Sequence, residues 1–190
     1  MDSVPIPSQT VGPYFHLGLT EKHSAACIAS SAANGERVWV TCRVFDGDGA
    51  PVDDAMIEVW QADSEGKYNH PDDLREKQSD PGCNGFGRLG TAADGSCQFE
   101  TIKPGSVPGR AGVPQVPHLN LAVFARGLLN HLYTRIYFAG DPGNEKDPVL
   151  GLVPQERRGT LMAQPDPARS GHWCFDIHLC GELETVFFDV

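Results

Sequence analysis

Apolar and polar residues alternate along much of the chain with the period of two that is typical of β-strands. The segment RVWVTCRVFD at 37–46 is the clearest case, because Val38, Val40, Cys42 and Val44 fall on one face. Similar runs predict strands within 55–62, 92–105, 118–125, 131–141, 172–181 and 184–190. The fourth and fifth of these segments, counted from 37–46, are expected to pair with each other, as are the last two. Short strands at this spacing predict an all-β fold, an antiparallel β-sandwich.

The segments outside these strands are expected to form an N-terminal arm and a long loop. Residues 1–36 have little strand pattern and several prolines, so we expect an extended arm followed by a sandwich over 37–190, all within one domain. The segment from Pro71 to Gly87 is expected to leave the sheet as a loop. Within it, DDLREKQ at 72–78 is the one segment that could form a short helix.

Composition and charge narrow the possible partners. The 190 residues include 21 glycines and 15 prolines, which favours many turns over long helices. A formal net charge of −10 argues against nucleic acids and anionic membranes as partners.

No apolar run is long enough to span a membrane and the start of the chain does not resemble a signal peptide, so we expect a cytoplasmic protein. The six cysteines lack CxxC spacing and are expected to be reduced thiols.

One strand carries residues with the spacing of metal ligands. His118 and Asn120 fall on the same side of the strand predicted within 118–125, about 6.6 Å apart along the backbone. Two imidazoles in this arrangement could share one ion, whereas the asparagine offers only a neutral carbonyl oxygen. Tyr68, beyond the end of the 55–62 strand, is the tyrosine best placed to add a phenolate. The residues alone leave two interpretations open: a weak metal site, or a half-buried histidine and a turn tyrosine with structural roles.

Several motifs taken together resemble the intradiol ring-cleavage dioxygenases, over nearly the whole chain. The motifs, in order, are SQTVGPYFHLGL, IEVWQADSEGKY, GFGRLGTAADGSCQFETIKPG, PHLNL, TRIYFAGD and GELETVFFDV. Within this family the chain is most similar to the iron-free alpha chain of the enzymes that are built from two kinds of chain. The resemblance implies a transthyretin-like sandwich core. No helical N-terminal dimerisation region, usual in the catechol-cleaving branch, is visible.

The resemblance also implies what has happened to the metal site. In iron-bearing chains of the family, two tyrosines and two histidines hold a non-haem Fe(III). Tyr68 and His118 match the first tyrosine and the first histidine, whereas Val107 and Asn120 fall on the other two positions. An arginine that iron-bearing chains place three residues before the first histidine is Gln115 here. The resemblance therefore implies a vestigial site with no metal and no catalytic residue on this chain, and Fe(III) on a partner beta chain in a higher-order hetero-oligomer.

The same resemblance implies that this chain completes the substrate pocket of its partner. The substrate would be 3,4-dihydroxybenzoate, which reacts with O2 to give 3-carboxy-cis,cis-muconate. The residues expected to contribute are Thr10, Gly12, Pro13 and Tyr14 of the arm, and Arg135 in LYTRIYF. Glycine permits close backbone approach and proline keeps the arm extended, while a guanidinium suits the substrate carboxylate.

Two other functions remain open at this level. The chain could be a self-sufficient dioxygenase with an altered metal site. It could instead be a scaffolding or binding sandwich with no role in turnover, since transthyretin-like sandwiches also serve as carriers. The sequence does not decide how many alpha–beta pairs assemble.

Overall fold

Strands dominate the part of the chain that the computed structural model describes, residues 7–12, 15, 17–21, 25–109 and 112–189. The strands are β1 (Arg37–Phe45), β2 (Met56–Trp60), β3 (Phe86–Gly90), β4 (Ser96–Ile102), β5 (Val107–Pro108), β6 (Pro114–Gln115), β7 (His118–Phe124), β8 (Leu132–Phe138), β9 (Met162–Pro165) and β10 (His172–His178). The helical segments are short: a π-helix η1 (Leu17–Glu21) and 3-10 helices η3 (Asn144–Lys146), η4 (Leu150–Leu152) and η5 (Gln155–Leu161). The predicted all-β class with few short helices is confirmed.

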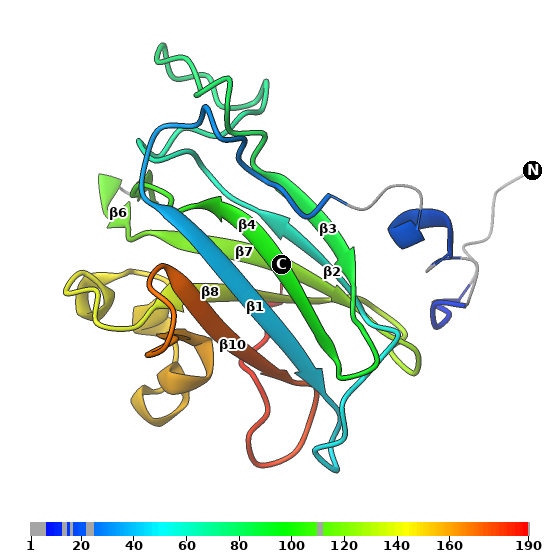
Figure 1. Cartoon of the computed structure of the whole chain (residues 1–190). Helices are drawn as coiled ribbons and strands as arrows, with labels where there is room; N and C mark the ends of the chain where they lie inside the picture. Colours follow the sequence, from blue (N-terminus) through cyan, green and yellow to red (C-terminus); the bar gives the residue numbers. More distant parts are fainter. Residues whose placement is uncertain (1–6, 13–14, 16, 22–24, 110–111, 190) are drawn as a thin grey trace, which may run out of the picture.

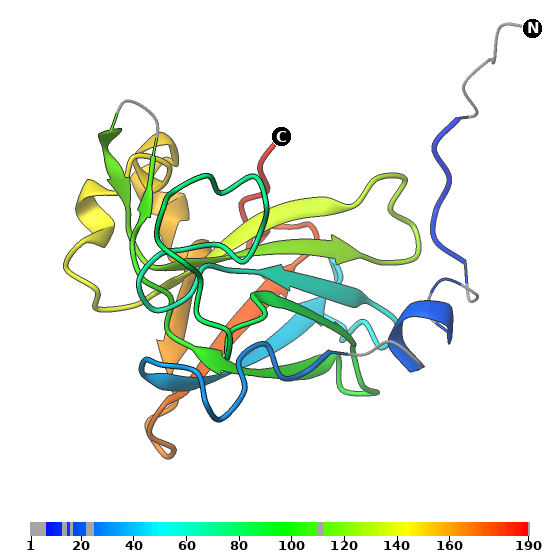
Figure 2. The same ribbon diagram turned by 90° about the horizontal axis from the view of Figure 1, so that it is seen from above.

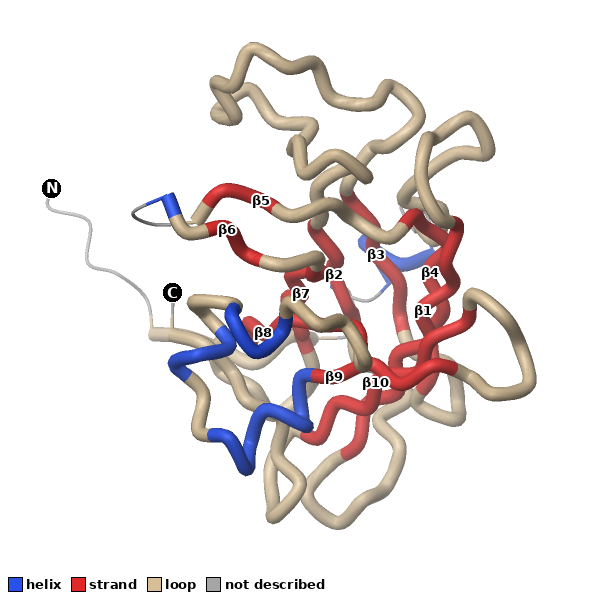
Figure 3. The backbone as a smooth tube through the Cα atoms, turned by 90° about the vertical axis from the view of Figure 1, so that its left-hand side faces the viewer, coloured by secondary structure: helices blue, strands red, loops and turns tan. Residues whose placement is uncertain are grey.

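The main sheet folds over on itself into two layers (Figures 1 and 2). Its strand order is β3-β2-β7-β8-β9-β10-β1-β4, so that β9 belongs to both layers. Most neighbours are antiparallel, including the predicted pair β7 and β8, but β1–β10 and β8–β9 are parallel. The short β5–β6 ribbon stands beside the ends of β2 and β7 (Figure 3). The architecture is therefore a sandwich with two parallel pairings.

The core lies between the layers and follows the alternation seen in the sequence. Val38, Val40, Cys42 and Val44 of β1 are fully buried, and Leu119, Leu121 and Val123 of β7 face them from the opposite layer. Because side chains alternate along a strand, His118 and Asn120 then belong to the outer face of the β2-β7-β8 layer. Burial of such aliphatic side chains is worth about 1.5–3 kcal/mol each and holds that outer face in place.

The short helix predicted at 72–78 is wrong. Residues 71–80 form turns and bends, with no helix. The ammonium of Lys67 donates to the carbonyl oxygens of Asp73 and Arg75, and the Arg75 guanidinium donates to the Gly66 carbonyl oxygen over 2.6 Å. Side chains thus take the carbonyl groups that a helix would have used.

The strand predicted at 184–190 is also wrong over its described residues, 184–189. They form no ladder with β10, and bond to its end at Thr185, whose N–H donates to the His178 carbonyl oxygen over 3.0 Å. A single bridge joins Phe188 to Tyr133 of β8. The loop expected between Pro71 and Gly87 ends slightly earlier than predicted, where β3 begins at Phe86. Gly87 has no room for a side chain, since a Cβ there would lie 2.7 Å from Ile28 Cγ1.

The N-terminal segment is only partly an extended arm. Residues 7–12 run along the side of the molecule, past the β7–β8 turn (Figure 2). Residues 25–29, by contrast, bridge to β3, to β4 and to Cys83, and Ile28 is buried in the core. In the described part of the chain, no helix has the length and apolar character needed to cross a bilayer.

Candidate functional site

A tight turn after β2 positions Tyr68. Asp63 organises it, because Asp63 Oδ1 accepts hydrogen bonds from the backbone N–H groups of Glu65 and Lys67. Gly66 adopts a φ of +78°, and a Cβ there would lie 1.9 Å from the Ser106 carbonyl oxygen. Only glycine fits this turn, which brings the segment containing Val107 against the segment containing Tyr68.

The Tyr68 side chain is held on two sides. Its ring stacks on Trp60 with centroids 6.1 Å apart, and its hydroxyl oxygen accepts a hydrogen bond from Asn120 Nδ2 over 3.4 Å. Burial raises the pKa of Tyr68, although Asn120 and the charge of Arg135 act in the opposite direction. At neutral pH the residue is therefore a phenol that keeps its proton, not a phenolate.

His118 is buried, with 3% of its surface exposed. Its Nδ1 lies 2.7 Å from the Val116 carbonyl oxygen, a contact that requires the proton on Nδ1 and leaves Nε2 as an acceptor. Nε2 is buried and has no hydrogen-bond partner. Burial and then the charge of Arg135 lower the pKa of His118 to about 4, so the imidazole is neutral at physiological pH.

At the other two predicted positions, Asn120 and Val107, the side chains are poor metal ligands. Asn120 Nδ2 also donates to the Trp60 carbonyl oxygen over 3.3 Å. That carbonyl can only accept, so the amide must present its nitrogen, which is no metal ligand, to this side. Val107 is buried in β5, where it pairs with Gln115 of β6. Of the four predicted positions, Tyr68 and His118 carry strong donor atoms, whereas Asn120 offers only a neutral amide oxygen and Val107 offers none.

Arg135 lies among these residues. It is the direct cross-strand partner of Asn120, and its Nη1 donates to Gln115 Oε1 over 2.6 Å and to the Tyr137 hydroxyl over 3.5 Å. Among the described residues, no carboxylate forms an ion pair with Arg135. A carboxylate is linked to it indirectly, because the Tyr137 hydroxyl donates to Asp147 Oδ1 over 3.1 Å. We call Tyr68, Val107, His118, Asn120 and Arg135 the remnant pocket.

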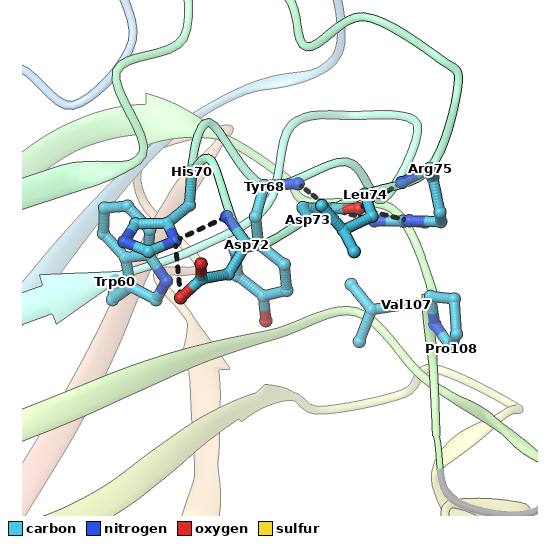
Figure 4. Close-up of a pocket in the computed structure, with 9 residues that line it drawn as sticks. All are labelled: Trp60, Tyr68, His70, Asp72, Asp73, Leu74, Arg75, Val107 and Pro108. Carbon is cyan, nitrogen blue, oxygen red and sulfur yellow. Dashed lines mark hydrogen bonds and ion pairs between the residues drawn. The ribbon is translucent and has the colours of Figure 1, made fainter.

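A hollow of about 410 Å³ opens above part of the remnant pocket (Figure 4). Tyr68 and Val107 face each other across it, and the Tyr68 hydroxyl points toward its floor (Figure 4). It is lined by Trp60, Tyr68, His70, Asp72, Asp73, Leu74, Arg75, Val107 and Pro108. A second hollow of about 460 Å³ continues along the same face of the sheet and shares Trp60 and His70 with the first.

The residues of the remnant pocket do not fit Fe(III). Only two strong donors, Tyr68 and His118, are present where a ferric ion needs several, and the Arg135 guanidinium, whose charge acts on both side chains, brings a permanent positive charge beside them. Within the described part of the chain, no group of three or more histidine, cysteine, aspartate or glutamate side chains could hold a metal ion. We therefore derive no reaction step through iron bound to this chain.

The predicted pocket residues of the arm lie elsewhere. Thr10 Oγ1 accepts a hydrogen bond from Gly127 N over 2.7 Å, at the turn between β7 and β8. Gly12 is exposed, and a Cβ built there would meet no atom within 4 Å. Pro13 and Tyr14 lie outside the described residues. Thr10 therefore lies at the β7–β8 turn, whereas Arg135 contacts Gln115 of β6 near the other end of this hairpin. Within one chain, the structure does not bring Thr10 and Arg135 together.

Two residues beneath the remnant pocket were missed from the sequence. Tyr137 and Asp147 are both buried, and Asp147 accepts hydrogen bonds from the backbone N–H groups of Val116, Val149 and Leu150. Tyr137 could have been found, because it lies two residues after Arg135 and therefore on the same face of β8. Nothing in the sequence pattern places Asp147 there.

Comparisons with known proteins relate the sequence and the fold to one family. A family profile described as Dioxygenase matches residues 10–181. The protocatechuate 3,4-dioxygenase alpha chain of Burkholderia cepacia is 43% identical, over 97% of this chain and 96% of that one. The beta chain of the same organism is 37% identical, over 80% of this chain and 67% of that one. Among solved structures, the dioxygenase domain of a dioxygenase carbohydrate-binding protein fusion from Streptomyces sp. SirexAA-E matches with a TM-score of 0.63 and 27% identity, over 96% of this chain and 100% of that domain.

Proposed function

The chain belongs to the dioxygenase family of intradiol ring-cleaving enzymes, and from this membership we propose that it is an alpha chain of protocatechuate 3,4-dioxygenase. The observation that carries the proposal is the 43% identity to an alpha chain along almost the full length of both proteins. The similarity to a beta chain is lower and covers less of both chains. The chemistry of the remnant pocket supports the same assignment.

The enzymes of this family depend on non-haem iron. In the proposed complex the Fe(III) is held by a beta chain, and O2 and 3,4-dihydroxybenzoate are converted there to 3-carboxy-cis,cis-muconate. Support comes from the donor set of this chain, where Val107 and Asn120 replace two ligands and Arg135 repels a cation. The existence of alpha and beta homologues agrees with a heteromer of the two chains.

This chain would contribute part of the wall of the substrate pocket and one positive charge. Thr10 and Gly12, with Pro13 and Tyr14 next to them, would form part of its wall through the exposed arm. Arg135 would guide the substrate carboxylate, because a guanidinium binds carboxylates with two hydrogen bonds and does not lose its charge. On a chain of net charge −10, such a local positive group would matter for attracting an anion.

The test is to purify the chain alone and together with a beta chain, and to measure bound iron and O2 uptake with protocatechuate. We expect stoichiometric iron and turnover only in the complex, with faster turnover than the beta chain shows alone. If the chain alone holds stoichiometric ferric iron with a visible tyrosinate band and cleaves protocatechuate, the proposal is overturned.

A further inference from the structure

The described part of the N-terminal arm is attached to the body of the chain through Thr10 and Phe15. Thr10 Oγ1 accepts the hydrogen bond from Gly127 N over 2.7 Å, in the turn that joins β7 to β8. Phe15 packs on Phe124, the last residue of β7, with ring centroids 5.3 Å apart and an interplanar angle of 41°. We call these two contacts the arm anchors. They lie on either side of Gly12 in the sequence.

The body's side of each anchor is fixed by the sheet. Phe124 pairs with Met56 of β2, and its ring also stacks on His131 with centroids 5.0 Å apart. Gly127 has a φ of +86°, in the left-handed region that favours glycine, and this conformation sets the direction of the N–H that Thr10 accepts. Both anchors therefore hold the arm on a rigid support.

Between the anchors, the backbone at Gly12 faces outward. Gly12 is exposed, and a Cβ there would meet no atom within 4 Å. Its carbonyl oxygen accepts from Phe15 N over 3.0 Å, which ties it to the second anchor. Two hollows, of about 410 and 190 Å³, lie between the arm and the body, both lined by Val11, Phe15 and Phe124. Because the arm is not closely packed there, its placement depends on the two anchors.

We propose that Phe124 and Gly127 are positioning residues, which hold the arm so that Gly12 is presented to the substrate pocket of a beta chain. A segment that is fixed before association loses less conformational entropy when it binds. Neither residue would touch the substrate, because each acts through its anchor on the arm. The inference rests on the proposed function, in which the arm forms part of that pocket's wall, and adds the residues of the body on which the wall depends.

The first test is made on the purified chain alone. Amide hydrogen exchange, followed by NMR, reads the first anchor, because its donor is the Gly127 N–H. Thr10→Val keeps the shape of the side chain but removes the acceptor, so exchange at Gly127 should become at least threefold faster. Phe124→Ala and Phe15→Ala each remove the second anchor and should speed the same exchange, because the arm then leaves the turn more often. The double variant should exchange no faster than either single variant, since both remove one contact.

The second test uses the complex with a beta chain and steady-state O2 uptake with protocatechuate. Phe15→Ala and Phe124→Ala should each raise KM at least threefold, with unchanged iron content and a smaller change in kcat. Phe124→Tyr keeps the ring and should restore the wild-type KM. Phe45→Ala is the matched control, since Phe45 ends β1 in the other layer and stacks on His178 with centroids 5.0 Å apart. It should match the wild type in exchange and in kinetics.

Unchanged unfolding midpoints establish that the variants are folded, and Phe15→Ala carries the test if Phe124→Ala unfolds. Unchanged exchange at Gly127 in the Thr10 and Phe15 variants would show that the anchors do not hold the arm. Faster exchange with an unchanged KM would show that they do not serve the pocket. Either result overturns the inference and leaves the assignment as an alpha chain intact. Failure of the proposed function is recognised separately, from iron and turnover in the wild-type chain alone, and would overturn this inference as well.

Discussion

Asn120 of β7 lies directly opposite Arg135 of β8, so that a neutral amide and a guanidinium stand side by side next to Tyr68. The amide nitrogen of Asn120 is turned toward Tyr68, and the guanidinium is held by Gln115. A cationic side chain therefore belongs to the same cluster as Tyr68 and Asn120, and the consequences of its charge can be measured.

The first prediction concerns substrate binding in the two-chain complex. Arg135→Ala should raise KM for protocatechuate about tenfold while kcat changes less, because a charge-assisted hydrogen bond to a carboxylate is worth roughly 1.5–3 kcal/mol. Iron content should stay intact. Steady-state O2 uptake by the complex measures both constants. Identical kinetics in the variant and the wild type would favour a scaffolding role for this chain.

The fold was predictable from the sequence where local pattern decides it. The alternation in 37–46 places Val38 and Val40 in the core, and the same rule puts His118 and Asn120 on one outer face. The parallel pairing of β1 with β10 joins segments about 130 residues apart and has no local signal. The irregular loop at 71–80 depends on the side chains of Lys67 and Arg75, which outweigh helix propensity.

For the candidate site, the sequence could suggest which residues lie together but not how they interact. Matching motifs predicted that Tyr68 and Asn120 belong to one site, and the structure joins these two residues through a hydrogen bond. The bond between Arg135 and Gln115 could not be found in this way, because it depends on where the β5–β6 ribbon lies. The roles of Thr10, Gly12 and Arg135 toward a partner stay predictions.

A second prediction concerns the buried polar pair that supports the turn after β2. Gln61 and Thr101 are both fully buried, and Thr101 Oγ1 donates to Gln61 Oε1 over 2.7 Å. Thr101→Val keeps the shape and leaves that oxygen unpaired, so it should lower the free energy of unfolding by about 1–3 kcal/mol. The control is Thr41→Val, which removes an exposed hydrogen bond to Gln98 and should change it by less than about 0.5 kcal/mol. Urea unfolding followed by tryptophan fluorescence compares the two, and equal losses would contradict the prediction.

A third prediction concerns acid stability and Asp73. Hydrogen bonds from Arg75 and then Lys67 hold the pKa of Asp73 well below its usual value of 3.8, against the effect of burial. The unfolded chain therefore binds the proton first as pH falls. The stabilisation is fully present above about pH 4 and is lost as the pH falls through 3.8 toward the folded-state pKa.

Asp73→Asn tests this. It should lower the urea midpoint at pH 7, and the difference from the wild type should shrink by pH 3. Asp72→Asn is the matched control, since its side chain is 93% exposed and it should follow the wild type at both values. A difference for Asp73→Asn that stays constant between pH 7 and pH 3 would show that its ion pairs do not carry the effect.

The last prediction concerns the effect of the Arg135 charge on the affinity of this chain for Fe(III). Val107→Tyr with Asn120→His restores the ligand types of iron-bearing chains, but Arg135 stays beside the restored set. Its charge disfavours a cation, and a like charge at close range shifts such equilibria by about tenfold or more. The double variant should therefore bind Fe(III) weakly, and adding Arg135→Gln should raise the affinity at least tenfold. Iron analysis after dialysis and the intensity of the visible tyrosinate band show which of the two variants binds Fe(III) more tightly. Equal iron binding by the double and triple variants would mean that the guanidinium does not limit the affinity for iron.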